Sequence, residues 1–204
     1  MVGPTDVVTV LGQRGTGKST LAWNFASLMP RLITFCRLGE HKKENYSHIV
    51  YNFDQFCETM LALEHSDRFR ILYKFDVESD GHGDEFNEAM RIIYYRKHLA
   101  RLIEEVWNFA SKNHIPKWLK ECYLTGRHND ICMITTSQRP ASIHNDILAQ
   151  TTQLFSGTQT NSNDILSLKE VLGREWAEKL KNLPKYEFIR FQSGIPPEFV
   201  NNKI

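Results

Sequence analysis

The sequence predicts an α/β fold in which a mostly parallel central sheet is covered by helices on both faces. Strand-like apolar runs alternate with amphipathic helical segments along the chain, and this alternation is typical of parallel sheets. A glycine-rich loop joins the first strand to the first helix. A length of 204 residues is sufficient for a full hydrophobic core, and we expect one domain over residues 1–204.

The strands are expected where short apolar runs lie between turn signals. These runs are 7–11, 32–36, 70–75, 99–103, 131–136, 153–157 and 187–191, with a shorter extended segment within 46–53. Helices are expected at 21–29, 53–64, 84–96, 117–124, 164–171 and 175–180. Apolar residues at helical spacing, such as Phe86, Met90 and Ile93, give these helices a buried face.

The composition is that of an ordinary globular chain, with 41% hydrophobic residues and a net charge of +1. This charge excludes an overall basic surface, so a face for nucleic acid has to be local or built by several subunits around a pore. The four cysteines show no C-x-x-C pair and no zinc-site spacing with histidine, so we expect buried thiols and no zinc. We also expect no transmembrane segment and no secretory signal, because no suitable apolar run is present.

The loop after the first strand matches the pattern G-x-x-x-x-G-K-[ST], with Gly12, Gly17, Lys18 and Ser19 at the fixed positions. Glycines allow the backbone to wrap closely, so that its N–H groups and the helix N-terminus face phosphate oxygens. We expect Lys18 to reach the β- and γ-phosphates and the Ser19 hydroxyl to bind Mg²⁺. The expected nucleotide-binding residues are Gly12, Gln13, Arg14, Gly15, Thr16, Gly17, Lys18, Ser19 and Thr20.

Hydrolysis of a nucleotide also needs an acidic pair near the phosphate loop, and two strand ends offer one. Glu104 and Glu105 follow the strand at 99–103, whereas Asp76 and Glu78 follow a more hydrophobic strand. We favour the first pair because adjacent carboxylates let Glu104 hold the metal's water shell while Glu105 acts as base. Asp76 is the alternative metal-side carboxylate. The other interpretation of the glutamates is that they are surface charges at a strand end.

Gln138 and Arg127 lie at opposite ends of the strand at 131–136. The carboxyl ends of parallel strands face the ligand crevice, where Gln138 can donate to a phosphate oxygen and orient a water. A glutamine in a turn before a proline is, however, more often structural. Arg127 precedes the strand, far from its own nucleotide, so a catalytic role would be on a neighbouring subunit. Otherwise it is a charge that complements the dipole at a helix C-terminus.

Together these segments resemble the FtsK/HerA superfamily of DNA-pumping ATPases. The similarity runs through 9–20, 102–109, 124–128, 134–140 and 146–150. Within that superfamily, the short chain without added domains is similar to the genome-packaging ATPases of icosahedral viruses with double jelly-roll capsids.

The resemblance implies a RecA/ASCE-like P-loop NTPase that uses ATP and Mg²⁺. It makes Lys18 the Walker A lysine, Ser19 the magnesium ligand and Glu105 the Walker B catalytic glutamate. It also makes Gln138 the sensor glutamine and Arg127 an arginine that acts in trans on a neighbouring subunit. Glu104 stands where the family usually has aspartate, and its extra methylene puts the water-mediated metal contact in question.

The resemblance further implies a homo-oligomeric ring, commonly a hexamer, that pumps double-stranded DNA into a preformed capsid. Its partners would be the DNA and capsid or portal-vertex proteins, in the cytoplasm of an infected host cell or on the virion. Two other functions remain open. A P-loop kinase or other small-molecule phosphotransferase would need an acceptor pocket, and a non-hydrolysing nucleotide switch would need neither Glu105 nor Gln138. DNA-stimulated ATPase activity distinguishes the motor from both.

Overall fold

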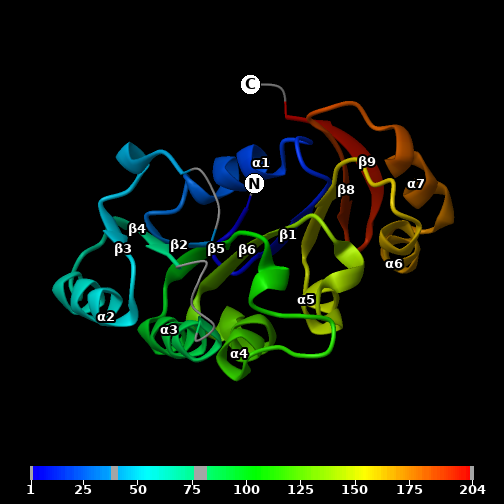
Figure 1. The fold of residues 1–204 in the computed structure, drawn as a ribbon. Coiled ribbons are helices and arrows are strands. Elements are labelled where there is room, and N and C mark those ends of the chain that lie inside the picture. The colour runs from blue at the N-terminus through cyan, green and yellow to red at the C-terminus, as the bar shows by residue number, and fades with distance from the viewer. Residues whose placement is uncertain (1, 38–40, 76–81, 203–204) are drawn as a thin grey trace.

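The computed structural model describes residues 2–37, 41–75 and 82–202. Nine strands within these ranges form one sheet in the order β3-β4-β2-β5-β6-β1-β7-β8-β9 (Figure 1). Their bounds are Val7–Leu11 (β1), Arg31–Cys36 (β2), His48–Val50 (β3), Phe69–Lys74 (β4), Leu99–Ile103 (β5), Ile131–Ser137 (β6), Gln153–Ser156 (β7), Glu187–Gln192 (β8) and Ile195–Asn201 (β9). Strands β1 to β7 pair in parallel, whereas β8 and β9 are antiparallel additions at one edge.

The helices cover both faces of this sheet. They are Lys18–Ala26 (α1), Phe53–Ala62 (α2), His82–Arg96 (α3), Lys117–Thr125 (α4), Asn145–Ala149 (α5), Ser162–Leu172 (α6) and Arg174–Lys179 (α7). Figure 1 shows α1 on one face of the sheet and α2, α3, α4 and α5 on the other, with α6 and α7 beside β8 and β9. No helix among the described residues is long and apolar enough to span a membrane.

The two larger hydrophobic cores lie on opposite faces of the sheet. On the first face, Leu21 and Ala22 of α1 pack with Leu102 of β5. On the second face, a larger cluster unites Phe56 and Phe86 with other buried side chains of α2, α3 and α4. Side chains alternate across a strand, so the end of β5 presents successive residues to opposite faces. This alternation matters for the two glutamates that follow Leu102.

The predicted α/β class, with a mostly parallel sheet and helices on both faces, is confirmed. The prediction that the strand at 187–191 is the last one is wrong, because Ile195–Asn201 forms β9. Pro196 and Pro197 lie in this strand, and β9 pairs with β8 at the edge of the sheet, where a missing N–H donor is tolerated. The five-residue α5 was also not predicted.

The strand order brings four carboxyl ends together at the centre of the sheet. β1 lies between β6 and β7, and β5 lies on the other side of β6. Because these four strands are parallel, the segments that follow each of them meet at the same edge. The phosphate loop follows β1, the glutamate pair follows β5, and Gln138 follows β6.

Candidate active site

The loop between β1 and α1 has the backbone geometry of an anion cradle. Gly15 and Gly17 have φ angles of 83° and 94°, in the left-handed region that favours glycine. A Cβ atom on Gly17 would lie 2.3 Å from the ring of Tyr186, so no larger residue fits there without displacing that ring. Helix α1 starts with no side-chain N-cap and no acidic residue in its first turn. Its first N–H groups are therefore open to phosphate oxygens.

Backbone hydrogen bonds from three neighbouring segments hold this loop. Gly12 N–H donates to the Ser137 carbonyl at 3.2 Å, and Gln13 N–H donates to the Thr158 carbonyl at 3.1 Å. On the other side, Tyr186 N–H donates to the Thr16 carbonyl at 3.0 Å. The loop is thus tied to β6, to the segment after β7 and to the segment before β8.

The side chains of the loop divide into an anchored part and an exposed part. The Thr16 hydroxyl donates to the Gln13 carbonyl at 2.9 Å, and the Gln13 amide donates to the Thr160 hydroxyl. Arg14 and Ser19 are exposed, and Thr20, in the first turn of α1, is half-buried. The exposed residues are therefore available to a ligand, while the anchored ones fix the shape of the loop.

Lys18 and Glu105 meet at the centre of the site. Lys18 Nζ lies 2.9 Å from Glu105 Oε1, and the two side chains are only 8% and 21% exposed. Glu105 adopts a left-handed conformation with φ 49°, and its N–H donates to the Thr136 hydroxyl at 3.0 Å. A non-glycine residue in this conformation is strained, and such strain is frequent at functional positions. The turn directs the Glu105 carboxylate to the lysine of the phosphate loop.

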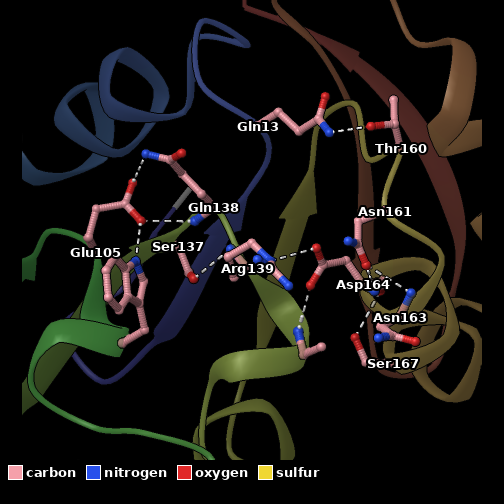
Figure 2. A network of polar contacts seen from close by, with 12 residues as sticks. Gln13, Glu105, Ser137, Gln138, Arg139, Thr160, Asn161, Asn163, Asp164 and Ser167 are labelled. Carbon is pink, nitrogen blue, oxygen red and sulfur yellow. Dashed lines mark hydrogen bonds and ion pairs between the residues drawn. The ribbon is translucent and has the colours of Figure 1, made fainter.

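Gln138 and Trp107 hold the same carboxylate. Gln138 donates to it twice, from its backbone N–H at 2.9 Å and from its side-chain amide at 3.2 Å (Figure 2). The Trp107 indole N–H adds a third bond at 3.0 Å. The structure thus brings Lys18, Glu105 and Gln138 into one network. Trp107 was not predicted, because an aromatic residue two positions after a glutamate carries no sequence signal.

A second network fixes the turn that carries Gln138. The Arg139 guanidinium lies 3.0 Å from the Asp164 carboxylate, which also accepts from the Ala141 N–H at 3.0 Å (Figure 2). Asp164 is almost fully buried at the start of α6, and Asn161 caps that helix. The position of Gln138 is therefore coupled to α6 through its neighbour Arg139.

Glu104 follows β5. Because side chains alternate along a strand, it lies on the opposite side of the sheet from Ile103, the last residue of β5. Its N–H donates to the Phe35 carbonyl at 3.0 Å, and its Oε2 lies 3.0 Å from His41 Nε2. Burial would lower the pKa of His41, but the Cys36 and Glu104 side chains outweigh burial and raise this pKa to about 9.

Magnesium is the metal that the phosphate-loop pattern implies, and the residues present fit it. Glu104 lies two positions beyond Leu102, on the face that α1 covers. Ser19, at the start of α1, has an exposed hydroxyl. A hydroxyl, a carboxylate and phosphate oxygens are the hard ligands that Mg²⁺ prefers, with water completing its shell.

Two predicted residues lie apart from this cluster. Arg127 is exposed in the short 3₁₀ helix Gly126–Asn129, which precedes β6. β6 is parallel to β1. Arg127, which precedes β6, therefore lies near the amino ends of these strands, whereas the phosphate loop lies at their carboxyl ends. Asp76 and Glu78, the alternative acidic pair, lie outside the described residues. They follow β4, which β2, β5 and β6 separate from β1.

Tyr186 is a further contact of the phosphate loop that was not predicted. Its ring lies against Gly17, its backbone is left-handed with φ 68°, and the Lys185 ammonium lies 4.7 Å from the ring centre. A flat ring beside the start of α1 is chemically suited to stack on a nucleotide base. No sequence pattern predicts this contact, because Tyr186 is far from the loop along the chain.

Comparison with known proteins establishes the fold. No protein-family profile matches the chain, and no curated protein sequence is significantly similar to it. Among solved structures, the genome packaging NTPase B204 from Sulfolobus turreted icosahedral virus 2, in complex with AMPPCP, is 16% identical with a TM-score of 0.76, over 100% of both chains. B204, the DNA-packaging ATPase from Sulfolobus turreted icosahedral virus, is 17% identical with a TM-score of 0.76, also over 100% of both chains.

A more distant similarity extends to larger proteins. The pCW3 conjugation coupling protein TcpA is 14% identical with a TM-score of 0.55, over 97% of this chain and 60% of that chain. At such identities the similarity concerns the fold. The chain therefore has the fold of the viral genome-packaging NTPase B204, and the resemblance noted in the sequence is confirmed at the level of architecture.

Proposed function

We propose that this protein is an ATP-hydrolysing motor that moves double-stranded viral DNA into a preformed capsid. The observation that carries the proposal is the contact of Lys18, Glu105 and Gln138 at the end of a phosphate loop. A nucleotide-binding switch needs the loop alone. The added carboxylate and amide are the groups that hydrolysis requires.

Binding of ATP would use the open start of α1 and the charge of Lys18. The helix N-terminus and backbone N–H groups favour the phosphates, and Lys18 neutralises the β- and γ-phosphate oxygens. Mg²⁺, held by Ser19 and through water by Glu104, would neutralise charge on the same oxygens. Tyr186 would stack on the base. The phosphates would thus be bound at the phosphate loop, and the base would be bound by the segment before β8.

Lys18 Nζ lies 2.9 Å from the Glu105 carboxylate. When a γ-phosphate takes over the lysine, the Glu105 carboxylate is released to accept a proton from water. Gln138, which donates to the carboxylate twice, would then orient this water and contact the γ-phosphate. We infer that nucleotide binding exchanges the partner of Lys18 and thereby activates the base.

A ring accounts for two features that a single chain does not use. Arg127 is exposed at the edge of the sheet away from its own phosphate loop. In a ring it would reach the γ-phosphate of a neighbouring subunit and stabilise the negative charge of the transition state. A net charge of +1 for each chain is also compatible with DNA binding if pore segments from several subunits combine. Capsid or portal-vertex proteins would hold the ring at the particle.

The proposal is tested by measuring ATP hydrolysis with and without linear double-stranded DNA, together with the mass of the assembly. We expect DNA to increase turnover and the mass to be a multiple of the 23.8 kDa chain. Glu58→Gln, on the exposed side of α2, is the matched control for Glu105→Gln. A monomeric protein whose rate of ATP hydrolysis does not change when DNA is added would contradict the motor function. Transfer of the phosphate to a small-molecule acceptor would contradict it as well.

A further inference from the structure

Three potential metal-ligating side chains converge on the α1 face of the sheet, beside the phosphate loop. Cys36 is the last residue of β2, His41 lies in the segment beyond it, and Glu104 follows β5. One ligand atom of each (the cysteine Sγ, a histidine ring nitrogen and a carboxylate oxygen) lies within 4.8 Å of the other two. All three side chains are buried or half-buried. The cluster is thus sheltered from bulk water.

The three ligand atoms are spaced closely enough for small shifts to bring them around a tetrahedral zinc ion. With zinc bonds of about 2.0–2.1 Å to nitrogen and oxygen and about 2.3 Å to sulfur, two ligands are about 3.3–3.6 Å apart. His41 Nε2 and Glu104 Oε2 are already 3.0 Å apart. By strict hydrogen-bond geometry, Nε2 has no well-aligned acceptor among the described residues. Once zinc replaces the proton on Nε2, the lone pair of this nitrogen would be available to the ion beside the carboxylate and the thiol.

The surroundings of His41 are those of a metal ligand. Its other nitrogen, Nδ1, lies 2.8 Å from the Tyr46 hydroxyl, which in turn donates to the Thr34 hydroxyl at 3.2 Å. Because the Tyr46 hydrogen is directed to Thr34, Nδ1 carries the hydrogen and Nε2 is left to bind. Trp23 and Tyr46 pack edge-on against the imidazole. An outer hydrogen bond that fixes the tautomer and ring is typical of histidines that bind metals.

We propose that Cys36, His41 and Glu104 bind a structural zinc ion that ties the end of β2 to the end of β5. A thiolate and an imidazole favour zinc over magnesium, and a water molecule would complete the tetrahedron. Zinc would use one oxygen of Glu104, which leaves the second oxygen for the water shell of Mg²⁺. A zinc ion at this position differs from the sequence-based expectation of no zinc, which considered only residue spacing along the chain. It does not depend on the proposed motor function.

The test is a cobalt and zinc titration of the metal-free protein, without nucleotide. We expect about one Co²⁺ per chain, with the visible bands of a tetrahedral site and a near-ultraviolet charge-transfer band from thiolate to cobalt. Zinc should displace the cobalt. Cys36→Ser should abolish the charge-transfer band, and His41→Ala should abolish tight binding. Tyr46→Phe should weaken binding about tenfold, since it removes only the outer hydrogen bond.

Cys57→Ser is the matched control, because Cys57 is a half-buried thiol on α2. It should leave the cobalt spectrum unchanged. A wild-type protein that shows no charge-transfer band with Co²⁺ would overturn the proposal, and this result needs no variant to fold. A band that survives Cys36→Ser and disappears in Cys57→Ser would overturn it as well. If the wild-type protein shows the cobalt charge-transfer band but its ATP hydrolysis is not stimulated by DNA, the motor function is refuted and the zinc site is not.

Discussion

Glu105→Gln is the substitution that most sharply separates nucleotide binding from hydrolysis. Glutamine has the same shape and keeps an oxygen to accept from the Gln138 N–H and the Trp107 indole. It cannot take a proton from water. Loss of a general base lowers turnover by about 10²–10⁴-fold, which corresponds to roughly 3–5 kcal/mol of transition-state stabilisation. We therefore expect ATP hydrolysis to fall by this factor.

Binding should change in the opposite direction. Glu105, 2.9 Å from Lys18, competes with phosphate oxygens for the positive charge of the lysine. Coulomb attraction at this distance is several kcal/mol at an effective dielectric constant of about 20, but desolvation and partial exposure offset most of it. Removal of the charge should leave a net gain of about 1 kcal/mol, or about fivefold tighter ATP binding.

The assay pairs steady-state phosphate release with calorimetric titration of ATP, and it uses Glu58→Gln as the control. Normal turnover in Glu105→Gln would refute the assignment of the base. If Asp76→Asn loses hydrolysis instead while ATP still binds, the other acidic pair carries the chemistry. If Glu105→Gln binds ATP much more weakly than the wild-type protein, the proposal that Lys18 exchanges Glu105 for the γ-phosphate is refuted.

Three further predictions concern other parts of the site and the core. Lys18→Ala should abolish measurable ATP turnover, because the β- and γ-phosphates lose their fixed positive charge; phosphate release at the wild-type rate would contradict the site. When Arg127→Ala subunits are mixed with wild-type subunits, activity should fall more than in proportion to the mutant fraction, whereas a linear mixing curve would exclude action in trans. Arg101 is fully buried in β5, and its guanidinium nitrogens have no well-aligned hydrogen-bond partner among the described residues. Arg101→Met should therefore leave the free energy of unfolding unchanged or raise it by about 1–4 kcal/mol in denaturant titrations. A clear loss of stability in that variant would show that interactions of the Arg101 guanidinium offset the free-energy cost of burying its charge.

Much of the fold follows from local patterns in the sequence. The strands at the centre of the sheet are continuous apolar runs, because parallel strands are buried on both faces, and such runs are readily recognised. Strand β9 has no such pattern, since most of its residues are exposed and two are prolines. The prediction therefore failed at the edge of the sheet, where burial no longer dictates the sequence.

The candidate site was predictable only in part, for a similar reason. The phosphate loop is contiguous, and its glycines are required by backbone geometry that the motif encodes. The glutamates and Gln138 were found because parallel strands end at a common edge. His41 and Tyr186 lie in segments between regular elements, and Trp107 lies in the short 3₁₀ helix Val106–Asn108, so no periodic pattern in the sequence predicts their contacts with the site. Their contacts became visible only in three dimensions.

Movement along double-stranded DNA, driven by ATP hydrolysis, is measured by displacement of a third strand from a DNA triplex, with the protein loaded on the duplex. We predict that ATP supports displacement by the wild-type protein and that Glu105→Gln, which retains ATP, does not displace the strand. A wild-type protein that binds the duplex and hydrolyses ATP but never displaces the third strand would contradict the proposed motor function.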